Sequence, residues 1–516
     1  MFYSALLLTG VNLLLRLAGT TFQVYLSGRI GAAGIGLLQL VLSVGNLSLV
    51  AGIAGVRTSA MYLTAEELGK RRPGNVRWIL SGCFLYSFLC CLFIGAVLYL
   101  LSPVIARNWI GDIRTVASLK TFAMFLPCVG LCSVMSGYFT AAGRIGTLSA
   151  VEVIEQGLSM GVTIALLHFW SGSDPGRACQ SVILGSSVAA CFTLVCLILI
   201  RCRESAPLSA PIPVRQRLLA AALPLAGADV VKAGINTLEN LMVPKRLALH
   251  PGTAEPLAAF GCITGMVFPI LMFPACILFG LSELLIPELA RCDAAGNRGR
   301  ICYLVKKSLW ISMLYGLLLG GLEFVLADFL CMRLYRNAEA GIFLRLYSLL
   351  IPMLYCDCIT DAMTKGLGQQ KVCVQYNILT SALDVAFLFL LLPRWGMAGY
   401  FVSFLLTHLL NFFLSLRRLL KITGIQLSFS VPVLAVSAAL VSAWGASQFR
   451  HPVTEVLAFC ALFGSLLCLL GVTGREDLLW MRNLLCSRRK IVSRRKESSC
   501  KKERILLFYG ENFSVR

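Results

Sequence analysis

Apolar stretches long enough to cross a lipid bilayer follow one another along almost the whole chain, and charged residues gather in the short gaps between them. A transmembrane helix needs about 20 mostly apolar residues, and backbone inside lipid must satisfy its own hydrogen bonds. The pattern therefore predicts an all-α polytopic membrane protein with about fourteen transmembrane helices. The predicted spans are residues 2–27, 35–63, 78–101, 116–140, 147–170, 178–200, 218–242, 257–286, 304–330, 342–365, 372–392, 397–416, 429–447 and 453–472.

The overall composition agrees with this class. The chain is 58% hydrophobic and 14% charged, with a mean hydropathy of +0.80. An ordinary soluble domain carries about 25% charged residues, so that class is excluded. The first span follows no basic segment and is not followed by a small-residue cleavage site, so we expect it to stay in the mature protein.

The distribution of basic residues predicts the orientation in the membrane. An even number of spans places both termini on one side, and most of the 46 lysines and arginines lie in the gaps facing that side or in the tail after Val472. The positive-inside rule makes this side cytoplasmic, so we expect a multi-pass protein of the cell membrane. The net charge of +21 is spread over loops and tail, which indicates contact of the tail with anionic lipid rather than with nucleic acid. The alternative for the tail is a disordered anchor.

Several glycines, a proline and an alanine recur in the second half of the chain at a constant offset of 225 residues. The pairs are Gly55 with Gly280, Ala65 with Ala290, Pro127 with Pro352 and Gly143 with Gly368. Six spans in each repeat give both halves the same orientation, related by an axis along the membrane normal. We therefore predict two six-helix bundles (1–203 and 204–421), two additional transmembrane helices (422–473) and a basic cytoplasmic tail (474–516). A cleft between such bundles is typical of an alternating-access carrier; the alternative is a duplication that serves only as scaffold.

Three segments give the chain a more specific resemblance. They are NLLLRLAGTTFQVYLSGRIGAAGIGLLQL, GIAGVRTSAMYLTAEELGKRRPGNVRWIL and FGLSELLIPELARCDAAGNRGRICYLVKKS. With the span count, they resemble the polysaccharide-exporter branch of the multidrug/oligosaccharidyl-lipid/polysaccharide (MOP) flippase superfamily. The resemblance implies a V-shaped bundle that moves an undecaprenyl-linked glycan or peptidoglycan precursor across the cytoplasmic membrane.

Cations inside the predicted spans are the first candidates for a substrate site, because a charge in the hydrocarbon is costly and normally faces a cavity. Arg16 lies about 20 Å along the first span, near mid-membrane. Near the start of the repeats the offset is 216 residues, which makes Lys232 the counterpart of Arg16, and Lys232 should lie at the same depth across the cleft. Arg57 lies in the inner half of the second span. Three cations suit a diphosphate-sugar headgroup. The alternative is that structural carboxylates neutralise them, for example Asp229 at Lys232.

The seventh span also carries carboxylates. Asp229, Lys232, Asn236 and Glu239 share one helical stripe, which predicts a polar face with Asp229 and Glu239 in coupling or gating roles. Glu283, close to Pro287 at the inner end of the eighth span, is a further candidate for a gate.

Two pairs of carboxylates occur at helical spacing. Asp357 and Asp361 are i, i+4 neighbours in the tenth span, and Glu152 and Glu155 are i, i+3 neighbours in the fifth. Like charges this close repel each other, and a proton or cation relieves the repulsion, as a coupled carrier requires. A structural salt bridge is the alternative for each.

Enzyme chemistry finds little support in the sequence. The four histidines have no metal-ligand spacing, no Walker A segment is present, and no catalytic Ser, His and Asp set can be placed together. We therefore predict a flippase without cofactor or metal, whose partners are a lipid-linked glycan and membrane lipids. The runner-up is a MATE-type multidrug/cation antiporter, which needs an anionic cavity; an integral-membrane transferase is less favoured because it needs an embedded His or Asp motif.

Overall fold

The computed structural model describes residues 2–70, 72, 74–170, 174–203, 214–426, 430–449 and 451–472. Nearly all of these residues are helical, and no strand occurs among them. The predicted all-α class is therefore confirmed. The chain forms two compact units, residues 1–426 and 427–516. The basic tail lies outside the described residues, and the division of the first unit into two bundles stays a prediction.

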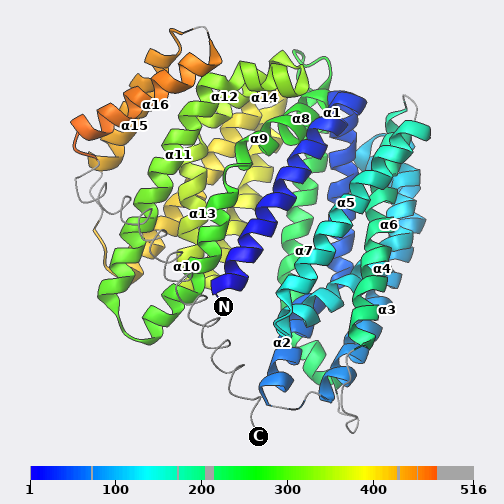
Figure 1. Ribbon diagram of the computed structural model, residues 1–516. Coiled ribbons are helices and arrows are strands. Elements are labelled where there is room, and N and C mark those ends of the chain that lie inside the picture. Colours follow the sequence, from blue (N-terminus) through cyan, green and yellow to red (C-terminus); the bar gives the residue numbers. More distant parts are fainter. Residues whose placement is uncertain are drawn as a thin grey trace, which may run out of the picture. The chain divides into compact units, whose positions relative to one another are not determined.

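Figure 1 shows long helices running side by side through the first unit. Its helices are α1 (Phe2–Ile53), α2 (Val56–Gly69), α3 (Asn75–Val104), α4 (Val116–Ala141), α5 (Ile145–Phe169), α6 (Pro175–Cys202), α7 (Val214–Leu247), α8 (Pro256–Cys262), α9 (Phe268–Met272), α10 (Cys276–Ala294), α11 (Arg298–Tyr335), α12 (Ala338–Ser348), α13 (Ile351–Gly366) and α14 (Gln370–Thr423). Three short turns, η1 (Ile105–Ile110), η2 (Ile113–Thr115) and η3 (Ile263–Val267), connect or continue them. The second unit contains α15 (Ser430–Ala446) and α16 (Pro452–Leu469), which pack against each other.

Polar residues in the gaps start several of these helices. Asp174 accepts a hydrogen bond of 3.0 Å from the Gly176 amide at the start of α6, where Pro175 takes the first helical position. Asn297 likewise accepts from the Arg300 amide at the start of α11. These side chains satisfy amides that have no partner within the helix.

Two of the long helices contain a chain reversal that separates predicted spans. Gly31 in α1 has φ 70° and ψ 176°, and Gly396 in α14 has φ 55° and ψ −133°. Glycine adopts such angles without a steric penalty. Gly31 lies between the predicted spans 2–27 and 35–63, and Gly396 lies between 372–392 and 397–416.

The predicted number of spans is not confirmed. By length and composition, eight helices among the described residues can cross a membrane, or up to ten if each of two bent pairs forms one span. The bent pairs are α8 to α9 with α10, at 63°, and α12 with α13, at 55°. Helix α1 joined to α2 counts once in this tally, as does α14, although each contains a reversal, and α15 has only 17 residues.

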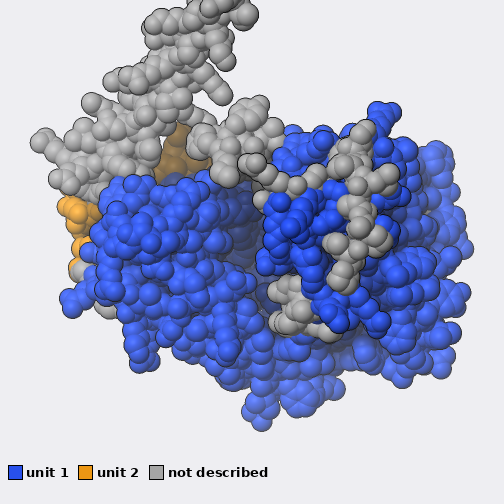
Figure 2. Space-filling view, turned by 90° about the horizontal axis from the view of Figure 1, so that it is seen from below, with its two compact units in different colours: residues 1–426 blue, residues 427–516 orange. Residues whose placement is uncertain are grey.

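The helices of the first unit pack in two groups. Helices α3 to α6 contact one another, as do α10 to α14, while α1 and α7 contact members of both groups. Small residues allow close approach, as where Gly185 of α6 faces α5 so closely that a Cβ atom would lie 2.9 Å from the Ser159 carbonyl oxygen. Seen from the side of the N-terminus, the first unit is hollowed between two lobes (Figure 2).

Candidate functional site

A break in the second predicted span positions Arg57. The helix is interrupted between α1 and α2, where Ala54 has φ 44° and Gly55 has φ 72°. Arg57 follows in the first turn of α2, which has no side-chain cap. The first amides of a helix have no intrahelical partner and carry a partial positive charge. The break therefore places an arginine and a helix N-terminus together, a combination that suits an anion.

Arg57 is exposed on α2. Its side chain is close enough to Glu152 of α5 for an electrostatic interaction. The backbone of α2 is held against α4, because a Cβ atom on Gly137 would lie 3.3 Å from the Met61 amide nitrogen. Arg57 is thus fixed by its backbone while its guanidinium group stays accessible.

Arg16 lies at the junction of the two helix groups. Its guanidinium carbon is 4.9 Å from the centre of the Phe279 ring on α10, which is a cation–π contact. Tyr355 of α13 is also within electrostatic reach. The sequence predicts that Arg16 lies on the wall of the first bundle. In the structure its side chain packs against α10 of the second half, and α1 contacts both α10 and α11.

Lys232 is exposed on α7, together with Asp229 and Asn236. The stripe predicted from the sequence therefore is polar and accessible over these three residues. Among the ion pairs of the described residues, none involves Arg16, Arg57 or Lys232. In particular, Asp229 does not form the ion pair with Lys232 that would have made Lys232 structural.

The fourth residue of the stripe, Glu239, belongs to a different site. Its carboxyl group lies against that of Asp384 in the first part of α14, within hydrogen-bonding reach. Asp384 is 6% exposed and accepts hydrogen bonds from Ser403 at 2.6 Å and Thr407 at 3.2 Å, both in the second part of α14. The reversal at Gly396 brings these two parts of α14 together. Two carboxyl groups surrounded by hydroxyl oxygens can hold one proton or a hard cation.

The two carboxylates of one predicted pair, Asp357 and Asp361, each have a further partner. In α13, Asp361 forms an ion pair of 2.6 Å with Lys365, while Asp357 accepts a hydrogen bond of 3.0 Å from Asn411 of α14. The side chains at this spacing therefore have separate partners, and the structural alternative for Asp361 fits the geometry better.

The remaining predicted carboxylates lie apart from this cluster. Glu283 is exposed on α10, and Glu152 and Glu155 are partly buried on α5. No group of three or more His, Cys, Asp or Glu side chains that could hold a metal ion occurs in the described part of the chain.

Two buried acidic residues that form no ion pair among the described residues are not among the candidates from the sequence. Asp384 and Glu323 are each 6% exposed, and Glu323 Oε2 has no hydrogen-bond partner among the described residues. Each is a single acidic residue within an apolar span, and a carboxylate in the hydrocarbon is a candidate for function whether or not it has a charged neighbour. Choosing mainly carboxylates at helical spacing or beside a basic residue leaves both of them out.

Comparisons with known proteins show which families and structures the chain is similar to. The family described as "Polysaccharide biosynthesis protein" matches residues 69–250. Stage V sporulation protein B of Bacillus subtilis (strain 168) is 22% identical over 496 residues, covering 92% of this chain and 96% of that protein. Sporulation protein YkvU of the same organism is 25% identical over 230 residues, covering 43% of this chain and 51% of its own length.

Solved structures share the fold at low sequence identity. The lipid II flippase MurJ, in an inward closed conformation, matches with a TM-score of 0.69 and 11% identity over 92% of this chain and all of that one. A multidrug resistance MATE family transporter of the MOP superfamily, in an inward-facing conformation, matches with a TM-score of 0.62 and 13% identity over 81% of this chain and all of that one. These matches confirm the predicted resemblance: the chain is a multi-pass membrane protein with the fold of the MOP-superfamily transporters. Its sequence is similar to stage V sporulation protein B and, over residues 69–250, to the polysaccharide biosynthesis family.

Proposed function

We propose that this protein is a flippase that moves a lipid-linked oligosaccharide or peptidoglycan precursor across the cytoplasmic membrane by alternating access. It acts as a carrier and not as an enzyme. Its substrate combines a long apolar chain, which stays in lipid, with a negatively charged phosphate headgroup, which has to cross. The proteins it resembles are named as flippases, transporters and sporulation proteins.

The set of accessible cations carries this proposal. Arg16, Arg57 and Lys232 lie on three different helices of an apolar unit, are partly or fully exposed, and form no ion pair with a carboxylate among the described residues, although Glu152 is within electrostatic reach of Arg57. A charge facing the hydrocarbon is costly, so such residues face water. Accessible cations without an ion-pair partner favour an anionic substrate, and guanidinium groups bind phosphate oxygens in a bidentate manner.

Transport then follows from a difference in affinity between two conformations. The headgroup binds Arg57 and the N-terminus of α2 on one side and Arg16, beside Phe279, on the other. If the two helix groups move apart, the number of phosphate oxygens held at once falls. A ligand drives a conformational change only through such differential binding.

Glu239 and Asp384 supply a coupling site away from the headgroup. Both lie in the second half, on α7 and α14, and share a buried environment with Tyr400. Entry or loss of one proton or cation changes the net charge between α7 and the two parts of α14. Because Lys232 lies on the same helix as Glu239, a shift of α7 would move a headgroup ligand with it. The remaining candidates for coupling or gating are Asp229 and Glu283, both exposed, and Asp357 and Asp361 on α13.

The orientation belongs to the same proposal. Both termini are placed in the cytoplasm, with the two repeats at residues 1–203 and 204–421, two further spans in 422–473 and the tail 474–516 on anionic lipid. The basic residues on the side of the termini support this orientation.

A multidrug or cation antiporter of the MATE type is the second candidate, because the solved MATE transporters share this fold and Glu239 and Asp384 form an acidic pair. The decisive experiment uses the purified protein in liposomes. A fluorescent lipid-linked glycan diphosphate should flip faster than in liposomes without protein. Absence of flipping together with proton- or sodium-driven uptake of cationic dyes would replace the flippase by the antiporter.

A further inference from the structure

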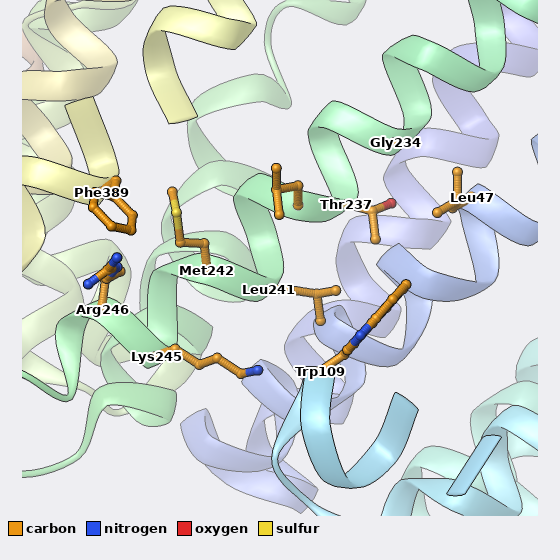
Figure 3. Close-up of a pocket in the computed structure, with 10 residues that line it drawn as sticks. Leu47, Trp109, Gly234, Thr237, Leu241, Met242, Lys245, Arg246 and Phe389 are labelled. Carbon is orange, nitrogen blue, oxygen red and sulfur yellow. The ribbon is translucent and has the colours of Figure 1, made fainter. Parts of the chain in front are cut away.

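A cavity of about 520 Å³ lies beside α7, between α1, η1 and α14 (Figure 3). Its wall is almost entirely apolar. The side chains that form it include Leu47, Leu238, Leu241, Met242, Trp109 and Phe389. The volume falls in the range of about 300–1,000 Å³ that is typical of sites for small ligands.

The cavity opens on the outer surface of the helices. Leu238, Phe389 and Trp109 are 55%, 48% and 48% exposed. On a membrane protein such large apolar side chains face the hydrocarbon, and a tryptophan is typical of the interface with water. An occupant can therefore enter from the lipid bilayer without crossing water.

Two cations lie at one end of this apolar wall. Lys245 and Arg246 belong to the last turn of α7, and neither forms an ion pair with a carboxylate of the described residues. The Lys245 ammonium group donates to the backbone carbonyl of Asn108 next to Trp109, and the Arg246 guanidinium carbon lies 3.2 Å from the centre of the Phe389 ring. Both charged groups are thus held at the edge of the cavity, as Figure 3 shows.

Neither the helix dipole nor a nearby carboxylate accounts for this arrangement. Basic residues in the last turn of a helix complement its dipole, but the dipole does not require a cavity beside them. Asp112, in the loop after η1, does not neutralise them, because it is paired with Arg114 at 2.5 Å. The hydrogen bonds from Arg114 also hold the pKa of Asp112 below its usual range.

We propose that this cavity binds one anionic phospholipid of the membrane, with an acyl chain against the apolar wall and the phosphate on Lys245 and Arg246. The site is distinct from the headgroup site, since Lys245 lies thirteen residues after Lys232 on α7, about 20 Å along the helix. The lining joins α1 of the first half to α14 of the second through α7. A bound phospholipid therefore stabilises the conformation in which these helices surround it.

A phospholipid fits this site better than a glycan or a peptide. The wall offers few polar atoms to sugar hydroxyl groups, and a buried polar ligand without partners is strongly disfavoured. The combination of an apolar trough and a cationic end matches a molecule with an acyl chain and a phosphate.

Native mass spectrometry of the purified full-length protein tests the proposal. The protein is titrated with phosphatidylglycerol and, separately, with phosphatidylcholine carrying the same acyl chains. We expect the first phosphatidylglycerol to bind about tenfold more tightly than phosphatidylcholine. The variant Lys245→Gln/Arg246→Gln should lose this preference. Arg333→Gln/Arg394→Gln, which removes two exposed cations outside the cavity, should retain it.

A second variant fills the cavity while keeping both charges. Gly234 lines the cavity, and a Cβ atom on it would have no heavy atom within 4 Å, so Gly234→Leu fits and also favours the helix. It should weaken binding of both lipids, whereas Gly161→Leu on α5, also unobstructed, should leave both unchanged. Equal affinity for the two lipids, or an unchanged preference in the double glutamine variant, would overturn the proposal. So would displacement of phosphatidylglycerol by a lipid-linked glycan diphosphate in one-to-one competition, which would assign the site to the transported substrate.

Discussion

Gly261 of α8 lies so close to Gly36 of α1 that a Cβ atom on Gly261 would be 2.5 Å from the Gly36 amide nitrogen. The backbones of the two halves touch here, close to the reversal of α1 at Gly31. One turn further, the Gln23 amide group donates a hydrogen bond of 3.2 Å to the Gly265 carbonyl. In this conformation the halves are therefore closed at the end away from the N-terminus, while Figure 2 shows the hollow at the other end.

Substitution Gly261→Ala should weaken this closure. The added methyl group forces the two backbones apart, and such overpacking costs about 1–3 kcal/mol. We expect faster amide hydrogen exchange in residues 32–40 and 256–265, measured by mass spectrometry in detergent. Gly157→Ala, whose Cβ would have no neighbour within 4 Å, is the control. Unchanged exchange at residues 32–40 in Gly261→Ala would show that this contact does not hold the halves together.

The start of α7 is joined to α2 of the first half by a second set of contacts. Arg217 donates to Glu67 at 2.9 Å and to Glu66 at 2.8 Å, and Glu67, whose side chain is 3% exposed, also accepts from Asn75 at 2.9 Å. Arg217→Ala leaves a buried carboxylate without its cation. We expect a loss of about 1–3 kcal/mol, seen as a lower apparent melting temperature.

A matched set of variants separates this effect from simple loss of charge. The neighbouring Arg215 is exposed and forms no ion pair among the described residues, so Arg215→Ala should leave the melting temperature unchanged. Adding Glu67→Gln to Arg217→Ala should recover part of the loss, because the unpaired charge is then removed. If Arg215→Ala and Arg217→Ala lower the melting temperature equally, the hydrogen bonds from Arg217 to Glu66 and Glu67 do not contribute specifically to stability.

The helical class and several polar positions can be predicted from the sequence because both follow from the cost of placing polar groups in lipid. Gly31 and Gly396 lie in the predicted gaps between spans for the same reason. Partner choice within the bundle could not be predicted in this way. The spacing of Asp357 and Asp361 places them on one face, and Asp361 pairs with Lys365 of the same helix. Asp357 instead accepts a hydrogen bond from Asn411 of α14, a contact that depends on the packing of α13 on α14.

The pair of Glu239 and Asp384 illustrates the same limit across a longer distance. The two residues lie on α7 and α14, and nothing in the spacing of either helix relates them. Their approach depends on the packing of α7 against α14, and the reversal at Gly396 turns Ser403 and Thr407 toward Asp384. Contacts set by such tertiary packing require the structure.

Neutral variants of this pair should uncouple transport. Glu239→Gln or Asp384→Asn removes one negative charge and with it the repulsion that a proton or cation relieves. We expect flipping in liposomes to lose its dependence on an imposed proton or sodium gradient, while Glu288→Gln, which breaks a surface ion pair with Arg300, leaves the dependence intact. Full gradient dependence in both Glu239→Gln and Asp384→Asn would exclude the pair as the coupling site.

The proposed orientation can be measured by thiol labelling. With the exposed native cysteines replaced, a cysteine at Asn75 or Asn297 should be protected in intact cells from a reagent that cannot cross the membrane. A cysteine at Asn108 or Thr253 should react, because these positions lie in the gaps proposed to face outward. Reaction at Asn297 without permeabilisation would reverse the orientation.

Arg16 and Lys232 are expected to bind the headgroup together. Arg16→Ala or Lys232→Ala should each abolish flipping of the lipid-linked glycan, with expression and membrane insertion retained, because neither residue has a carboxylate partner among the described residues to leave unpaired. Arg16→Lys should keep part of the activity if charge matters more than the bidentate geometry. Phe279→Leu removes the ring 4.9 Å from the Arg16 guanidinium group and should reduce flipping less than Arg16→Ala, since the cation remains but is less well oriented. The measurement is the initial rate of flipping in liposomes at equal protein content. A parental rate in Arg16→Ala would make this residue structural and leave Arg57 and Lys232 as the headgroup ligands to test.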